Sequence, residues 1–389
     1  MGLRTDQVSP PSLSITVLVK AGSRQENLSN SSVANFAAHA ARSGTGKYSK
    51  DKIEEVIESI SGELKIDVSR ELTEFTLTFD PSQLAQAVDL LSELVLNPSY
   101  EAVEVEALKP TLHKRASPMD PYDVTREAVH YTAFRDHFMG QPSYGIKDVV
   151  YSINGEQIRE YHNNFYVGQN IVISGAGNLS AENLLNEVSN SHFGKVPAER
   201  ISEVPNSDQP MFTPSLLYQR DDEMLNTGFS VAFLAPRWGD ADHFAMMYFK
   251  RVIGEYRCDK YTGEHLNSAH LQYNHFHTWM GNHPDMIMQK PYYFAYSDTG
   301  LFGNFIYGNE MYTQEMSVIT QNHMSCYAQY VPLLTPRSTR PKSSGPATSS
   351  STTSSSTTPL TGWPSTTRAR LPTSTGWWTA LRSRHAALT

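Results

Sequence analysis

Cysteine is scarce in this chain of 389 residues, which contains only Cys258 and Cys326. Two thiols so far apart along the chain do not make the disulfide framework of a small secreted domain. They suit a reducing environment such as the cytosol or an organelle matrix. Long apolar runs are missing as well, and none approaches the roughly 20 residues that a bilayer-spanning helix needs. We therefore expect no direct membrane span.

The N-terminal residues lack the marks of a targeting segment. MGLRTDQVSPPS is neither a secretory signal nor an Arg-rich amphipathic presequence. Either the chain stays in the cytosol or its natural N-terminus lies upstream of Met1.

Acidic side chains are absent from residues 331–389, whereas the whole chain has a net charge of −8. These residues hold seven Lys and Arg side chains, so residues 1–330 carry −15, which is −8 less the +7 of this segment. Such an acidic body argues against nucleic acid and anionic membrane surfaces as partners. Residues 331–389 are rich in Ser, Thr and Pro without periodicity, and a glycosylated stalk or an RNA-contacting arm would be functional readings. We favour a disordered tail produced by a reading-frame error.

Hydrophobic periodicity predicts an α+β fold from residue 13 onward. The β-branched residues of 14–21 are typical of a buried strand, and alternation at 64–68 and 75–79 predicts an antiparallel pair. A further strand at 170–175 closes this unit. Helical spacing and capping residues predict helices at 32–42, 50–60, 81–97, 100–116, 121–138 and 155–166.

The opening pattern returns in the second half of the chain. SITVLVKAGSR at 14–24 is echoed by SVAFLAPRW at 230–238, and a helix at 241–253 follows the second copy. Strands near 291–298 and 301–308 and a helix from about 310 continue it. Such a repeat predicts two tandem homologous domains, each a mostly antiparallel sheet flanked by helices. The expected boundaries are a first domain at 13–196, a linker at 197–215, an apparently truncated second domain at 216–330 and the tail at 331–389.

Six segments resemble one family and occur in its order. They are VLVKAGSRQE, GTGKYSKDKIEEVIESISGELKIDVSRELTEF, EVEALKPTLHK, TAFRDHFMGQPSYG, YSINGEQIREYHNNFYVGQNIVISGAGN and YSDTGLFGNF. The chain resembles the mitochondrial processing peptidase subunits and the two core proteins of ubiquinol–cytochrome c reductase (respiratory complex III), which are pitrilysin-type inverted zincins. The resemblance spans roughly residues 13–325. It implies a pair of peptidase-like α+β domains, the first of them inactive, that form half of a hollow clam-shell heterodimer.

Active members of this family carry His-x-x-Glu-His and a further Glu about one long helix pair later. The resemblance places the two histidines on Asn35 and His39 and the catalytic glutamate on Ala38. The third ligand should fall within 108–117, but LKPTLHKRAS has no carboxylate and carries His113, Lys114 and Arg115 at its centre. One imidazole cannot hold zinc, and alanine cannot act as a general base. We expect a peptidase homologue without catalytic residues, metal or other cofactor.

Two kinds of non-catalytic relative are implied. Core protein 2 supports the membrane subunits of complex III from the matrix side, and EVEALKPTL and YSDTGLFG resemble it most closely. The resemblance then implies a core protein 1 or processing-peptidase β partner, contacts with complex III membrane subunits, and a place at the mitochondrial inner membrane. The alternative is the presequence-binding α subunit of the processing peptidase, although residues 254–285 have only scattered glycines where that subunit has a glycine-rich loop.

Other conspicuous residues have structural interpretations. Five histidines lie between His265 and His283 near Cys258, Glu264 and Asp285, but their spacing matches no known ligand set. We interpret them as a polar loop and strand rather than a metal site. The full set of histidines is His265, His270, His275, His277 and His283.

Three further features are interpreted as packing or pairing. His39 alone on an apolar helix is expected to be a hydrogen-bonded core residue or a relic of the lost site. Arg70 and Glu71 are predicted to form a structural ion pair. The aromatic residues Tyr292, Tyr293, Phe294 and Tyr296 are predicted to pack a strand.

Overall fold

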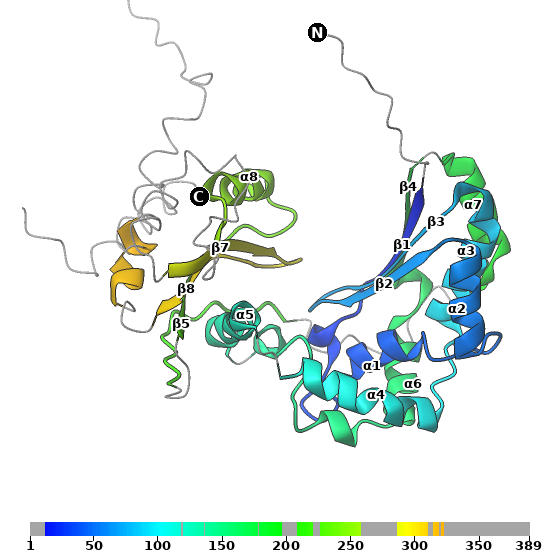
Figure 1. Ribbon diagram of the computed structural model, residues 1–389, viewed down its shortest axis with the longest axis horizontal. Helices are drawn as coiled ribbons and strands as arrows, with labels where there is room; N and C mark the ends of the chain where they lie inside the picture. The colour runs from blue at the N-terminus through cyan, green and yellow to red at the C-terminus, as the bar shows by residue number, and fades with distance from the viewer. Residues whose placement is uncertain are drawn as a thin grey trace, which may run out of the picture. The chain divides into compact units, whose positions relative to one another are not determined.

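The computed structural model describes residues 12–117, 120–135, 137–177, 179–196, 208–220, 226–257, 286–309, 314–318 and 320–322. These residues build two antiparallel four-stranded sheets with helices packed against them (Figure 1). Strands of the first sheet come from residues 13–176, and strands of the second come from residues 226–309. The expected α+β class with tandem antiparallel sheets is confirmed. None of the helices in the described residues has both the length and the hydropathy of a bilayer-spanning segment.

The first sheet has the strand order β2-β3-β1-β4. Its strands are β1 (Leu13–Val19), β2 (Glu63–Val68), β3 (Thr73–Phe79) and β4 (Ile171–Ala176). Alternate side chains of β1 and β3 are buried, which is the period expected of a sheet with one face on the core. β1 pairs with β3 on one side and with β4 on the other, so a strand from far along the chain completes the sheet.

Six helices surround this sheet. They are α1 (Val33–Ala40), α2 (Lys50–Ser59), α3 (Leu84–Leu96), α4 (Ala102–Arg115), α6 (Gly155–Phe165) and α7 (Ala181–Asn190). α3 packs on β3 and α7, whereas α1 packs against α4, α6 and β2 (Figure 1). The predicted helices are confirmed with somewhat shorter bounds, and α7 is an amphipathic helix that the sequence reading did not include.

The capping chemistry explains where several helices begin. Asp80 accepts a hydrogen bond from the backbone N–H of Ser82, and α3 follows this 3₁₀ turn. Asn154 and Gln157 form a capping box at the start of α6. Ser49 precedes α2 as predicted, but its hydroxyl makes no capping hydrogen bond.

The second sheet has the strand order β5-β8-β7-β6. Its strands are β5 (Asn226–Leu234), β6 (Tyr256–Arg257), β7 (Met286–Ala295) and β8 (Gly300–Asn309), with α8 (His243–Ile253) following β5. β5 and α8 repeat the succession of β1 and α1, as the sequence echo predicts. Gly303 pairs with Ala232 of β5 at a point where a Cβ atom would lie 2.2 Å from the Val231 carbonyl oxygen. The close approach of the two strands therefore requires glycine.

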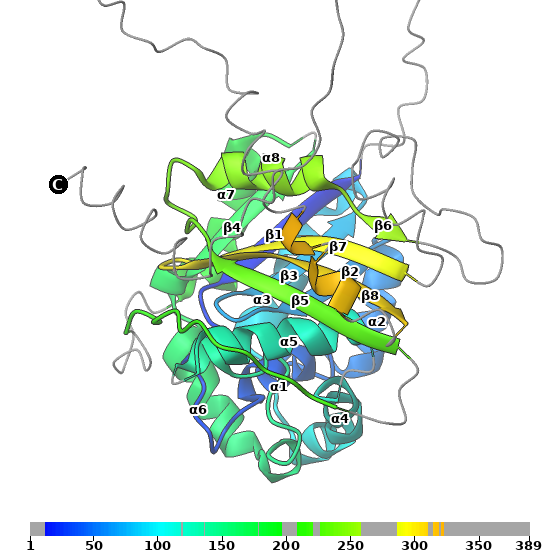
Figure 2. The same ribbon diagram turned by 90° about the vertical axis from the view of Figure 1, so that its left-hand side faces the viewer.

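Helix α5 (Pro121–Ala133) packs along β5 and β8 of the second sheet, while α8 packs along β7 (Figure 2). The ring of Tyr122 meets Phe305 edge-on at 5.5 Å between centroids, and the Lys290 ammonium lies 3.9 Å from the Tyr122 centroid. The helix ends at Ala133, earlier than expected, because residues 138–140 form a separate 3₁₀ turn. The domain boundaries 13–196, 197–215, 216–330 and 331–389 stay a proposal, and residues 197–207, 221–225 and 323–389 lie outside the described residues.

Candidate functional site

Helix α1 carries the positions that the family resemblance assigns to zinc chemistry. Its residues are small or apolar, and every side chain except His39 is buried. Ser32 precedes the helix and makes no side-chain cap. The buried carboxyl group of Glu26 replaces that cap, since its oxygens accept hydrogen bonds from the backbone N–H groups of Ser32 at 2.8 Å and Ala34 at 2.9 Å. The N-terminus of α1 is thus held inside the core.

Asn35 and Ala38 occupy the positions of the first ligand and the general base. The Asn35 amide is buried and its Nδ2 donates a hydrogen bond to the Ser143 carbonyl at 2.9 Å. Ala38 is fully buried and belongs to the hydrophobic core of the first sheet. The Asn35 amide therefore donates its hydrogen bond to the backbone, and Ala38 contributes only packing.

His39 faces the C-terminal half of α4. Its Nε2 lies 2.5 Å from Nη1 of Arg115, within the segment where the resemblance expects the third zinc ligand. Burial first, and the Arg115 charge second, lower the pKa of His39 to about 4, while the carboxylate of Asp67 acts in the opposite direction. The imidazole is therefore neutral at pH 7, and Nε2 accepts a hydrogen bond from the guanidinium. The expectation that His39 is hydrogen-bonded is confirmed.

A cavity of about 350 Å³ opens beside this pair. It lies between α1, α2 and α4, and its charged lining residues are Arg42, Lys50, Glu54 and Arg115. Arg42 donates from Nε and Nη2 to the two carboxylate oxygens of Glu54 at 2.8 and 2.9 Å. Its apolar lining residues are Leu108 and Leu112 of α4. The residues that the resemblance assigns to zinc chemistry consequently border a hollow lined mainly by cations.

No group of three His, Cys, Asp or Glu side chains that could hold a metal ion occurs within the part of the chain that the structure describes. The histidine-rich segment from His265 to His283 lies outside the described residues, as do Cys258 and Cys326. The interpretation of that segment stays a prediction.

The predicted ion pair between Arg70 and Glu71 is wrong. Arg70 Nη2 contacts the Glu127 carboxylate at 2.5 Å, and its Nε donates to the Met139 carbonyl at 3.0 Å. Glu71 instead contacts Arg24 at 2.8 Å. Arg70 and Glu71 lie in the turn between β2 and β3, where the two side chains reach different partners.

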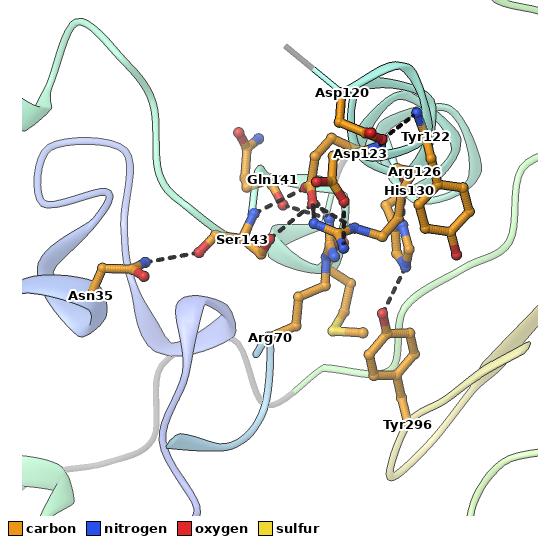
Figure 3. A network of polar contacts seen from close by, with 12 residues as sticks. Asn35, Arg70, Asp120, Tyr122, Asp123, Arg126, His130, Gln141, Ser143 and Tyr296 are labelled. Atoms are coloured by element: carbon orange, nitrogen blue, oxygen red, sulfur yellow. Dashed lines mark hydrogen bonds and ion pairs between the residues drawn. The ribbon is translucent and has the colours of Figure 1, made fainter. Parts of the chain in front are cut away.

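Glu127 is the centre of a buried polar network that the sequence reading missed. Figure 3 labels its partners Arg70, Arg126 and Ser143. Its carboxylate also contacts Arg126 at 3.1 Å and accepts hydrogen bonds from the Ser143 backbone N–H and hydroxyl. Burial would raise the pKa of Glu127, but the charges of Arg70 and Arg126 outweigh it and hold the pKa at about 2. Since Ser143 also accepts from Asn35, the network extends to α1. A Glu at an ordinary position of α5 offered no signal in the sequence.

His130, one turn along α5, joins this region to the second sheet. Its Nδ1 lies 2.7 Å from the Arg126 carbonyl and must donate to it, so its Nε2 accepts from the Tyr296 hydroxyl at 2.7 Å (Figure 3). Burial lowers the pKa of His130 to about 3, which keeps the ring neutral. The predicted packing role of the aromatic strand residues is confirmed by the stacked rings of Tyr292 and Phe294, with centroids 5.2 Å apart.

Known proteins resemble this chain, which has two antiparallel sheets and the buried helix α1 next to the first of them. Residues 5–146 match the family profile described as Insulinase (Peptidase family M16), and residues 152–285 match the profile of the Peptidase M16 inactive domain. The chain belongs to peptidase family M16.

The M16 relatives of this chain include mitochondrial proteins of two kinds. Mitochondrial-processing peptidase subunit beta of Bos taurus is 29% identical over 287 residues, which cover 73% of this chain and 57% of the relative. Cytochrome b-c1 complex subunit 1 of Homo sapiens is 26% identical over 327 residues, covering 82% and 66%. This M16 chain spans roughly three fifths of the length of these curated relatives.

Solved structures share the fold at lower sequence identity. A chain of complex III2 from Candida albicans (Inz-5 bound) has a TM-score of 0.62 and 16% identity, over 78% of this chain and 68% of that chain. A protease from Helicobacter pylori has a TM-score of 0.65 and 14% identity, over 82% and 80%. These similarities establish a common M16 architecture, and the chemistry of the site is argued from its residues.

Proposed function

We propose that this M16 chain is a non-catalytic core subunit of mitochondrial complex III, with a structural role in assembly on the matrix side of the inner membrane. The observation that carries the proposal is the contact between His39 and Arg115. It places a guanidinium against the one imidazole left in the motif, and Asn35 and Ala38 supply neither a second imidazole nor a carboxylate. Metal-assisted hydrolysis needs both a bound ion and a group that takes a proton from water.

The relatives support a place in complex III. Cytochrome b-c1 complex subunit 1 is among them, and a complex III structure shares the fold. Within the core proteins, the segments EVEALKPTL and YSDTGLFG favour core protein 2. The partner would then be a subunit of the core protein 1 or processing-peptidase β type, and the second set of contacts would be with complex III membrane subunits.

A second candidate function is the non-catalytic, presequence-binding subunit of the mitochondrial processing peptidase. Processing-peptidase β subunits are relatives with 26–29% identity, so a role beside such a subunit deserves its own test. In this role the partner supplies zinc, and this chain supplies part of a binding cavity. The two roles share the missing catalytic set and differ in the complex that contains the chain.

Native electrophoresis of mitochondrial extract separates these two functions. An antibody against this chain should detect it in the band that contains cytochrome b, and the band should persist after gentle detergent extraction. Detection only in a soluble dimer that cleaves presequences would reject the core-subunit function and support the peptidase function. Detection outside mitochondria would reject both.

Zinc content tests the chemical premise separately. The purified chain alone should bind less than stoichiometric zinc and should not cleave a presequence peptide, with or without added zinc. The His39→Gln variant is the matched control, because it removes the remaining imidazole. If the unsubstituted chain bound stoichiometric zinc and cleaved the peptide, and His39→Gln abolished both, the non-catalytic assignment would be wrong.

A further inference from the structure

The cavity between α1, α2 and α4 has an unusual charge for this molecule. Residues 1–330 carry a net charge of −15, whereas the cavity is lined by Arg42, Lys50 and Arg115 with Glu54 as its one carboxylate. Asp67, an exposed residue of β2, is a further acid whose charge acts on His39. Two positive charges therefore remain in a hollow of an otherwise acidic protein. A concave site with apolar walls concentrates the field of such charges.

The four charged side chains that line the cavity differ in how many of their hydrogen-bonding atoms already have a partner. Arg42 and Glu54 neutralise each other through two hydrogen bonds. Arg115 gives one N–H to His39 and, among the described residues, no other partner is recorded for its guanidinium. The Lys50 ammonium likewise makes no hydrogen bond within the described part of the chain, although it stands close enough to Glu54 to lower the pKa of that carboxyl. Arg115 and Lys50 thus keep donors free toward the cavity.

Arg115 is also fixed in a way that suits recognition. The hydrogen bond to His39 Nε2 holds one edge of the guanidinium, which leaves the remaining N–H groups in a defined plane. A planar guanidinium matches the oxygens of a carboxylate or phosphate, and an ammonium adds a point charge. The cavity of about 350 Å³ lies at the small end of the range for ligand sites, so its occupant is a small group.

We propose that this cavity is an oxyanion-binding site in which Arg115 and Lys50 bind a phosphate or carboxylate group. The Arg115 guanidinium presents positive charge where the family resemblance expects a metal ion, and a bound oxyanion would be its ligand. The proposal does not depend on membership of complex III, because every residue that lines the cavity lies between His39 and Arg115 of this chain. A failed binding test therefore leaves the proposed function untouched.

Calorimetric titration of the full chain at low ionic strength tests this site. Inorganic phosphate and sodium acetate are the two probes, and either one binding at a single site supports the proposal. Tighter binding of phosphate identifies a phosphate-type ligand, whereas equal or tighter binding of acetate identifies a carboxylate. Binding should weaken as salt is added, because the attraction is between charges near solvent.

Three substitutions assign the binding to the cavity. Arg115→Gln and Lys50→Gln should each weaken the preferred probe by roughly tenfold or more, since a charge-assisted hydrogen bond contributes about 1.5–3 kcal/mol. Lys52→Gln is the matched control, because Lys52 lies on the same helix, pairs with Glu55 at 2.9 Å and does not line the cavity. It should leave the affinity unchanged.

A purely structural Arg115 would behave differently. Arg115→Lys keeps the positive charge but loses the planar set of N–H donors of the guanidinium. It should therefore bind the probe more weakly than the unsubstituted chain and more tightly than Arg115→Gln. The probe should also shift one histidine signal in the NMR spectrum, and that signal should be missing in His39→Gln. The proposal is overturned if neither probe binds in the millimolar range. It is also overturned if Arg115→Gln and Lys50→Gln, folded by circular dichroism, bind as Lys52→Gln does.

Discussion

The carboxylate of Glu127 should be one of the most stabilising charges in the chain, and Glu127→Gln tests this. Its side chain is 12% exposed and its partner Arg70 is 4% exposed, so both charges are largely removed from water. Gln keeps the shape but loses the charge, which leaves two guanidinium groups buried beside it. Removing one partner of a buried ion pair costs about 3–5 kcal/mol, and we expect a loss of that size at pH 7.

The pKa of Glu127 gives a second route to the same magnitude. It is about 2 in the folded chain against an ordinary 4.5, a difference of roughly 2.5 units or ~3 kcal/mol. Because the folded pKa is lowered, this stabilisation is complete above pH 4.5 and is lost as the pH falls from there toward about 2. The difference between the unsubstituted chain and Glu127→Gln should therefore shrink in acid.

Glu54→Gln provides the matched control. Glu54 also pairs with an arginine, but the side chains of Arg42 and Glu54 are 46% and 38% exposed. Exposed pairs contribute about 0–1 kcal/mol, so Glu54→Gln should have a small effect. The assay is equilibrium urea unfolding followed by far-ultraviolet circular dichroism, at pH 7 and again near pH 3. Equal losses for the two variants, or a Glu127→Gln loss that is the same at both pH values, would refute the reasoning.

Three further substitutions have definite expected outcomes. Burial raises the pKa of Glu26 to about 8, so the folded chain keeps this carboxyl neutral at pH values where the unfolded chain ionises it. Relative to Glu26→Gln, the free energy of unfolding of the unsubstituted chain should fall by ~1.4 kcal/mol for each unit that the pH rises from 4.5 to about 8. Urea unfolding measures this, and an unchanged difference between the two chains would contradict it. Asn35→Ala leaves the buried Ser143 carbonyl without its donor and should cost about 1–3 kcal/mol, seen as a lower thermal midpoint; an unchanged midpoint would show that the bond contributes nothing. Gly303→Ala places a Cβ atom against the Val231 carbonyl oxygen and should lower the free energy of unfolding by about 1–3 kcal/mol, because β5 must move away from β8. Thermal unfolding measures this loss, and an unchanged melting temperature would contradict the prediction.

The positions that the resemblance assigns to zinc chemistry carry a positive charge of the protein itself. The Arg115 guanidinium lies there and donates a hydrogen bond to His39. The first hydrophobic core closes around Ala38, so α1 keeps its packing while its chemistry is gone. Stability and catalysis are thus separable on this helix, because packing depends on volume and catalysis depends on specific donors.

Most of the first sheet could be predicted from the sequence. Alternation in Leu64–Val68 and Phe75–Phe79 predicted an antiparallel pair, and the pair is β2 with β3. The helices after β3 were predicted from apolar spacing and from Asp80 at the cap. The packing of α5 on β5 and β8 could not be predicted, because its partners on the second sheet lie more than 90 residues further along the chain. Helix α7 was also missed, since its apolar face is short and none of its side chains is buried.

What the sequence determined by itself is local: periodicity set the strands and helices, and residue type removed the carboxylate and one imidazole from α1. The tertiary structure alone decided which polar groups meet. His39 and Arg115 are separated by 76 residues, Arg70 and Glu127 by 57, and His130 and Tyr296 by 166. Hydrogen bonds and ion pairs act over a few ångströms, so a pair of this kind exists only after the sheets and helices have brought its members together. For that reason five residues of the sequence were enough to predict the absence of a zinc motif, whereas the contact between Arg115 and His39 could be found only in the fold.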